Sequence, residues 1–183
     1  VWDGDDPHGG AALEFDSAEI AEPDLGHIVE DSLLRSRLVE LVTALPNAEI
    51  ATGASIESID TGERNVTVVL RGGGSAAGAV LVAADGTDST VRGLLGLPVA
   101  TRSYGQTAIV ANIRTAEPHR STAWQRFLPG GPLALLPLTD GSCSIVWSLP
   151  AADAARLATE SEHEFTAALQ QVSAGVLGAL ELV

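Results

Sequence analysis

The pattern of apolar and polar positions changes near residue 100, and the first part of the chain mixes helical and strand periods. Residues 31–45 repeat apolar side chains at helical spacing, with Asp31 as the expected N-cap and Pro46 ending the helix. Alternation within 48–70 predicts strands joined by a turn at 61–63. The apolar face of the predicted helix carries Leu34, Leu38, Leu41, Val42 and Leu45.

An uninterrupted apolar run, Ala79–Ala84, ends abruptly in Asp85 and Gly86, and a short helical stretch follows at 91–95. Such a run predicts a strand buried on both faces, and ligands of open α/β sheets lie beyond the carboxyl ends of such strands. Asp85 would offer an acceptor there, Gly86 would allow a close approach of the backbone, and Arg92 would offer a cation. A structural explanation is equally good, since Asp85 can cap the helix while Gly86 supplies a positive φ.

From residue 101 the pattern is typical of an antiparallel sheet with strands over 106–114, 122–128, 133–138 and 142–148. In the last strand Cys143, Ile145 and Trp147 share one face, and the serines and Val146 share the other. This alternation suits a sheet with one face on a core and the other lining a wet or ligand-bearing space. Helices are predicted over 151–158 and, after a capping box at Ser161–Glu164, to about residue 172.

Composition excludes several classes of function. A net charge of −14 argues against nucleic acid as a partner and against electrostatic docking on anionic lipid. The single cysteine, Cys143, lies in an alternating apolar run, which predicts a buried and inert thiol. The four histidines lack metal-ligand spacing, no nucleophile–base pair is evident, and no apolar stretch reaches the roughly 20 residues of a membrane span.

The segment Asp85-Gly86-x-x-Ser89-x-Val91-Arg92 after an apolar run resembles the Asp-Gly motif of flavoprotein aromatic hydroxylases. Further segments, in the same order along nearly the whole chain, resemble one branch of these enzymes, the ubiquinone-biosynthesis FAD-dependent monooxygenases. The most specific are the Trp-Gln-Arg-Phe and Gly-Pro-Leu segments. The segments are 1–3, 26–30, 104–106, 118–119, 123–129, 131–138 and 143–148.

The resemblance implies an α+β / α/β fold, with part of an FAD-binding Rossmann-like domain and an antiparallel-sheet substrate domain, as in para-hydroxybenzoate-hydroxylase-like flavoproteins. Residues 1–21 and 101–183 would form the substrate domain, and 22–100 part of the FAD domain. The implied reaction is hydroxylation of a prenylated phenol or quinol with FAD and NAD(P)H. The alternative is a non-catalytic module that binds a prenyl tail or a protein partner through the sheet.

The same resemblance assigns residues to sites. Asp85 and Gly86 would lie near the FAD pyrophosphate and ribose, and Arg92 would help to place the reductant. Trp124, Arg126, Leu133 and Leu135 are the candidate substrate contacts. Two structural explanations stand beside them, because Arg126 could be a surface arginine laid over Trp124 and the leucines could be core. Ser89 is expected to be a helix cap.

Departures from the family pattern lead to further expectations. No Gly-x-Gly-x-x-Gly turn occurs, the only Gly-Asp pair is Gly4-Asp5, and no His-Pro pair is present. We therefore expect a central piece of a longer enzyme that binds no FAD by itself and self-associates through an exposed sheet edge. The resemblance places the complete enzyme in the cytoplasm or peripherally at the inner membrane, and allows membership of a biosynthetic complex.

Overall fold

The computed structural model of the protein describes residues 1–10 and 12–183. The chain forms two compact units, Val1–Leu34 with Ser103–Val183 and, separately, Arg35–Arg102. The first boundary between them falls inside helix α1, Asp31–Thr43. The assignment of substrate and cofactor roles to residues 1–21, 22–100 and 101–183 stays a prediction.

The larger unit is built on a six-stranded sheet with the strand order β1-β6-β7-β8-β5-β9. Among the described residues of this unit, only β1 and β6 pair in parallel; the other neighbours are antiparallel, as the sequence predicts for this part of the chain. The strands are β1 Trp2–Asp3, β5 Gln106–Thr115, β6 Trp124–Phe127, β7 Leu133–Pro137, β8 Cys143–Pro150 and β9 Leu180–Leu182.

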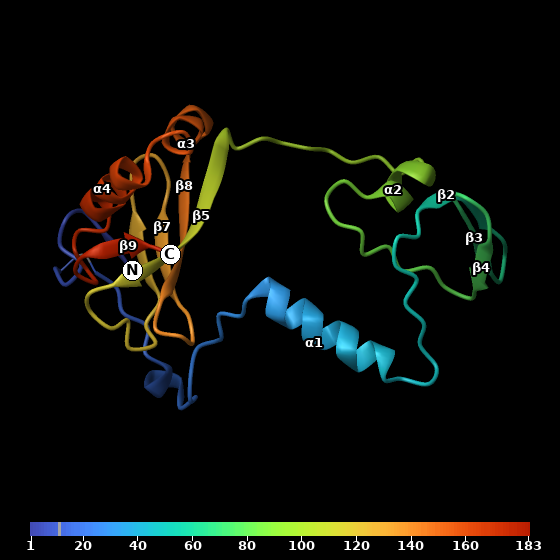
Figure 1. The fold of residues 1–183 in the computed structure, drawn as a ribbon, viewed down its shortest axis with the longest axis horizontal. Helices are drawn as coiled ribbons and strands as arrows, with labels where there is room; N and C mark the ends of the chain where they lie inside the picture. Colours follow the sequence, from blue (N-terminus) through green and yellow to red (C-terminus); the bar gives the residue numbers. More distant parts are fainter. Residues whose placement is uncertain (11) are drawn as a thin grey trace. The chain divides into compact units, whose positions relative to one another are not determined.

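Helices α3, Ala151–Leu157, and α4, Glu162–Val172, both lie on one side of this sheet (Figure 1). The predicted alternation of β8 is confirmed, because Cys143, Ile145 and Trp147 are buried while the residues between them are half-buried. The core beneath the helices joins these side chains to Phe165 and Leu169 of α4. Hydrophobic burial on one face therefore holds the sheet and helices together.

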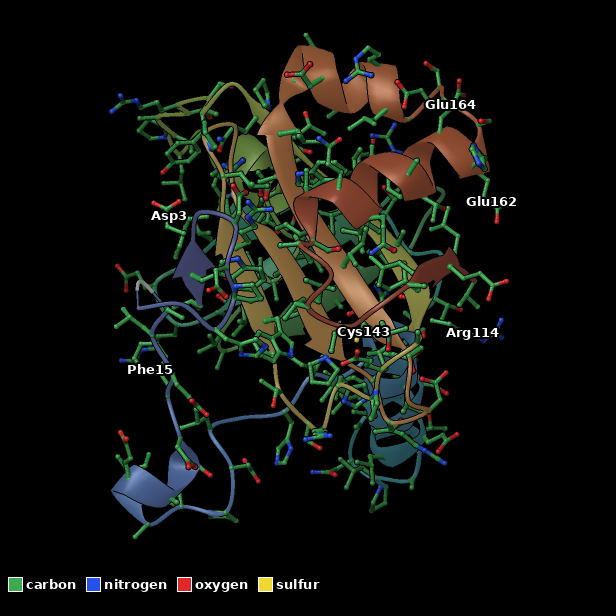
Figure 2. All side chains as sticks on the ribbon, turned by 90° about the vertical axis from the view of Figure 1, so that its left-hand side faces the viewer. Asp3, Phe15, Arg114, Cys143, Glu162 and Glu164 are labelled. Atoms are coloured by element: carbon green, nitrogen blue, oxygen red, sulfur yellow. The ribbon has the colours of Figure 1, made fainter. Side chains whose placement is uncertain are left out.

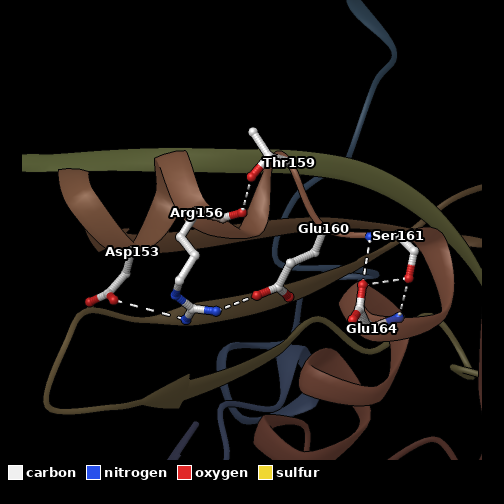
Figure 3. Close-up of polar contacts among 6 residues, drawn as sticks. All are labelled: Asp153, Arg156, Thr159, Glu160, Ser161 and Glu164. Atoms are coloured by element: carbon white, nitrogen blue, oxygen red, sulfur yellow. Dashed lines mark hydrogen bonds and ion pairs between the residues drawn. The ribbon is translucent and has the colours of Figure 1, made fainter.

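The start of α4 confirms the predicted capping box. The Ser161 hydroxyl accepts a hydrogen bond from the Glu164 amide, and the Glu164 carboxylate accepts one from the Ser161 amide at 3.0 Å (Figure 3). Nearby, Arg156 lies between Asp153 and Glu160 on the exposed side of α3. Both acidic residues of the first turn of α4 are exposed, as labelled in Figure 2, where they favour the helix electrostatically.

The amino-terminal segment folds back on itself and joins the large sheet. Val1 and Leu13 exchange two backbone hydrogen bonds of 2.7 and 2.8 Å across a Gly/Asp-rich turn, and β1 joins the sheet edge beside β6. Ala11 of this segment lies outside the described residues. A 3-10 helix, η1, follows at Ser17–Ile20. Strand β9 was absent from the sequence-based prediction.

The smaller unit holds a three-stranded antiparallel sheet, β2-β3-β4, and the short helix α2. The amide of Gly62 donates to the carbonyl of Asn65 and closes the predicted turn between β2 and β3. A glycine-rich hairpin turn follows β3 and leads into β4. The bounds are β2 Ile56–Thr61, β3 Val66–Leu70, β4 Ser75–Gly78 and α2 Thr90–Leu94.

The predicted buried strand at 79–84 is wrong for this structure. No strand forms there among the described residues, and Val80 and Val82 are 77% and 79% exposed. A strand needs a hydrogen-bonded neighbour, and the described backbone offers none to this segment. The helix predicted at 31–45 is present as α1, yet its apolar face carries no buried residue. None of the described helices is long and apolar enough to cross a membrane.

Candidate functional site

The loop from Asp85 to Arg92 is organised by its own side chains. The Ser89 hydroxyl donates to one carboxylate oxygen of Asp85 at 2.6 Å, and the Val91 amide donates to the other at 3.1 Å. The Ser89 hydroxyl also accepts a hydrogen bond from the Arg92 amide at 3.0 Å, which makes Ser89 the predicted cap of α2. Both Asp85 oxygens therefore hold the start of this helix.

The remaining predicted cofactor residues lie in the same loop. Gly86 has a φ of +81°, which a residue with a side chain adopts only with strain, and a Cβ placed there would meet no atom within 4 Å. The Arg92 guanidinium donates through Nη2 to the carbonyl of Thr87 at 2.5 Å. Arg92 is thus tethered to the loop through one nitrogen, and Gly86 leaves one side of the loop open.

Hydrogen bonds to Asp85 stabilise its charged form. The Ser89 hydroxyl, followed by the Val91 amide, holds the pKa of Asp85 below its ordinary value, because both donors favour the charged carboxylate. Asp85 is therefore ionised at neutral pH. Its charge is balanced locally by donors that belong to the helix start.

A hollow of about 280 Å³ is lined by this loop and by apolar side chains after it. Its walls include Asp85, Gly86, Ser89 and Arg92, together with Leu95 and Leu97. A guanidinium and a glycine backbone suit an anionic group, and the apolar wall suits a sugar or ring beside it. The chemistry of this set is compatible with the pyrophosphate and ribose part of FAD.

The four predicted substrate residues share one face of the larger sheet, since Trp124 lies opposite Leu135 and Arg126 lies opposite Leu133. This is the face that carries the helices. Leu133 and Leu135 are fully buried within the core cluster, which accords with the structural explanation for them. Trp124 is half-buried and packs edge to face on Trp2 with ring centroids 6.0 Å apart.

Arg126 is buried, so the alternative of a surface arginine is wrong. Its side chain is only 8% exposed, and Nη2 pairs with Asp5 at 2.5 Å while Nη1 donates to the Val172 carbonyl at 2.8 Å. The guanidinium thereby joins the amino-terminal turn to the end of α4. A helix carboxyl terminus favours such a cation.

The opposite face of the same sheet carries residues that sequence reasoning did not assign. Residues that pair across neighbouring strands form two rows on this face. The first row runs across four strands and consists of Gln125, Ala134, Val146 and Val110. The second consists of Leu136, Ser144 and Asn112. Val110 is 64% exposed and Phe127 49% exposed. The alternation of β8 already indicated such a face, and only the pairing register shows which residues of the other strands join it.

Two further kinds of site, a metal site and a reactive thiol at Cys143, were considered in the described part of the chain. No group of three or more His, Cys, Asp or Glu side chains there could hold a metal ion. Cys143 is fully buried, and burial raises the pKa of its thiol. Figure 2 labels it at the start of β8. The predicted burial of the thiol is thereby confirmed.

Relatives of known function match most of the chain. The mitochondrial ubiquinone biosynthesis monooxygenase COQ6 of Caenorhabditis elegans is 35% identical over 158 residues, which cover 84% of this chain and 35% of the relative. The ubiquinone hydroxylase UbiL of Rhodospirillum rubrum is 35% identical over 136 residues, which cover 74% of this chain and 32% of the relative. The chain is therefore similar, over most of its length, to monooxygenases and hydroxylases of ubiquinone biosynthesis. No protein-family model matches it.

Solved structures of other monooxygenases share the fold of this chain. PqsL of Pseudomonas aeruginosa, a probable FAD-dependent monooxygenase, superposes with a TM-score of 0.62 at 23% identity over 82% of this chain and 45% of its own. The p-nitrophenol 4-monooxygenase PnpA of Pseudomonas putida gives a TM-score of 0.57 at 18% identity, over 85% of this chain and 41% of its own. The predicted fold class is confirmed. The chain spans about a third of the length of the curated relatives it matches.

Proposed function

We propose that the protein carrying this chain is an FAD- and NAD(P)H-dependent monooxygenase that hydroxylates a prenylated phenol or quinol in ubiquinone biosynthesis. The observation that supports it most strongly is the 35% identity to a ubiquinone biosynthesis monooxygenase over 84% of the chain. The loop with Asp85, Gly86 and Arg92 adds chemical support, since its groups suit the pyrophosphate part of FAD.

In this proposal the loop holds the cofactor and does not itself react. Bound FAD would supply the oxygen chemistry, while the protein supplies position and electrostatics. Arg92 offers a fixed positive charge, and Gly86 lets the ligand approach the backbone. Asp85 acts chiefly on the loop, because both of its oxygens already accept hydrogen bonds from it.

We further propose that the substrate lies on the open sheet face. Trp124, Arg126, Leu133 and Leu135 would then support that face from the core side. Val110, Val146 and Leu136 offer apolar contact for a prenylated ring, and the serine and asparagine among them offer polar groups. The core-side residues and the open-face residues alternate along each strand, because successive side chains point to opposite faces.

The test uses the complete reading frame that contains this chain. Purified enzyme should retain FAD through gel filtration, oxidise NAD(P)H faster when a short-chain prenylated phenol is added, and add one oxygen atom to that phenol. Asp85→Ala should weaken FAD retention. Asp140→Ala is the matched control, because Asp140 also accepts a 2.6 Å hydrogen bond from a serine hydroxyl, but in the β7–β8 turn.

The 183-residue chain alone should remain colourless after incubation with FAD, because it lacks the Gly-x-Gly-x-x-Gly turn. Binding of prenylated phenol without flavin retention or NAD(P)H oxidation in the complete protein would favour the non-catalytic module instead. Equal FAD retention in Asp85→Ala and the wild type would remove Asp85 from the proposed cofactor site.

A further inference from the structure

Gln106, the first residue of β5, reaches across the end of β8 to the turn between β6 and β7. Its Nε2 donates a hydrogen bond of 3.0 Å to the carbonyl of Gly130, which lies 24 residues further along the chain. Strand β8 lies between β5 and β7 in the sheet, and its last residue, Pro150, is the pairing partner of Gln106. One side chain therefore ties the first residue of β5 to a turn on the far side of β8.

The turn that receives this hydrogen bond lies directly against β8. A Cβ at Gly131 would be 2.6 Å from the Ser148 carbonyl oxygen, and a Cβ at Gly130 would be 3.2 Å from Cδ of Pro150. The two glycines thus allow the backbone of the turn to approach β8 closely. The Gly130 carbonyl is consequently held at a defined place beside Gln106.

The hydrogen bond to Gly130 fixes the orientation of the Gln106 amide. A carbonyl only accepts, so it selects the NH₂ group of the amide and leaves Oε1 as the outward acceptor. Oε1 accepts no hydrogen bond from any residue that the structure describes, and the side chain is exposed. Gln106 lies on the same face as Val110, since the two are an even number of residues apart on β5. The open face therefore carries an acceptor that is already oriented.

We propose that Oε1 of Gln106 accepts a hydrogen bond from the phenol hydroxyl of the substrate. The inference rests on the proposed function, which places a prenylated phenol on this face. A phenol O–H needs an acceptor, and one that is held in advance loses little conformational entropy on binding. The neighbouring positions on this face, Ala108 and its cross-strand partner Ser148, have short side chains and leave the amide accessible to a ring. Gln106 would thereby select phenols over their methyl ethers.

The experiment is calorimetric titration of the complete, FAD-loaded enzyme with a short-chain prenylated phenol and with its methyl ether, which lacks the donor. The wild type should bind the phenol at least about fivefold more tightly, the effect of one net hydrogen bond. Gln106→Met, which has neither amide group, should remove this preference. Gln106→Glu keeps an acceptor but loses the donor to Gly130, so it should retain the preference.

Gln170→Met is the matched control. Nε2 of Gln170 also donates a 3.0 Å hydrogen bond to a glycine carbonyl, that of Gly178, but from helix α4. This variant should lower stability and leave the ratio of the two dissociation constants unchanged. The same ratio in Gln106→Met as in the wild type would overturn the proposal. So would an equal loss in Gln106→Met and Gln106→Glu, because the residue would then act only through the turn.

Hydroxylation assays on the same samples separate this inference from the proposed function. A wild type that binds the phenol with the expected preference but does not hydroxylate it would contradict the proposed function and support the role of Gln106. Hydroxylation by an enzyme whose preference is insensitive to Gln106 would overturn only the role of Gln106. A wild type that binds neither compound would overturn both.

Discussion

The hydroxyl of Ser89 donates a 2.6 Å hydrogen bond to the carboxylate of Asp85, four residues earlier in the chain. The same pairing of a serine hydroxyl with a nearby carboxylate occurs between Ser142 and Asp140, and between Ser161 and Glu164, each at 2.6 Å. In all three the carboxylate lies in a turn or at a helix start. Only the first pair lines the hollow proposed for the cofactor.

Replacing Ser89 should separate capping from cofactor positioning. Ser89→Ala in the complete enzyme removes the cap of α2 at a cost of about 0.5–2 kcal/mol, and releases one oxygen of Asp85. Because the loop then loses its fixed shape, we expect the Kd for FAD to rise. Flavin fluorescence titration measures this change, and Ser89→Thr, which keeps the hydroxyl, should restore binding.

Ser161→Ala provides the matched control, since it removes a serine cap of the same kind at the start of α4. It should cost a similar amount of stability and leave the Kd for FAD unchanged. Equal FAD affinity in Ser89→Ala and Ser161→Ala would mean that Ser89 serves the helix alone.

Acid should loosen the loop through Asp85. Its folded pKa is depressed, so its contribution to stability is present above the unfolded pKa, about 3.9, and is lost as the pH falls through the folded value. The exchange protection of the Val91 amide, which donates to this carboxylate, should therefore fall in that window. Hydrogen exchange by NMR measures it, and Asp85→Asn should show no such pH dependence.

Arg126 should matter far more to stability than its ion-pair partner. Arg126→Met leaves the Val172 carbonyl without its donor and removes a buried anchor, which should cost about 1–3 kcal/mol in urea unfolding. Asp5 has a fully exposed side chain, so Asp5→Asn should change the unfolding free energy little. Comparable losses in the two variants would show that the ion pair, and not the burial of Arg126, stabilises this corner.

The turn between β6 and β7 should tolerate no side chain at Gly131. A Cβ there would lie 2.6 Å from the Ser148 carbonyl oxygen, and the φ of +135° is one that side chains rarely adopt. Gly131→Ala should therefore lower the melting temperature, with a loss of about 1–3 kcal/mol. Gly141→Ala, also at positive φ but with no atom within 4 Å, should cost less. A smaller loss at Gly131 than at Gly141 would contradict this argument.

The antiparallel part of the fold was predictable because each strand there carries its own signal. Alternation in β8 predicted which of its residues are buried, and the Ser-x-x-Glu pattern predicted the start of α4. Both depend on neighbours within the same segment. The burial of Arg126 was not predictable, because it rests on Asp5 and Val172, which lie far away in sequence.

The structure of the apolar run at 79–84 could not be predicted from its own residues. Its composition is that of a strand buried on both faces, yet a strand exists only where another strand meets it, and no composition supplies that neighbour. The short helix after it formed as predicted, since Ser89 and Asp85 cap it locally. The helix cap in the candidate cofactor loop could therefore be predicted from the sequence, whereas the residues of the open sheet face could be identified only from the pairing register.

The register of the large sheet assigns each strand residue to one of its two faces, so substitutions at neighbouring positions act on opposite faces. In β6 and β5 the two faces alternate residue by residue, as they do in β7 and β8. On the proposed substrate face, a library that seeks a new substrate preference would vary residues 125, 127, 134, 136, 144 and 146 and hold their immediate neighbours constant. Stability and selectivity could then be evolved on interleaved positions of the same strands, with little interference between them.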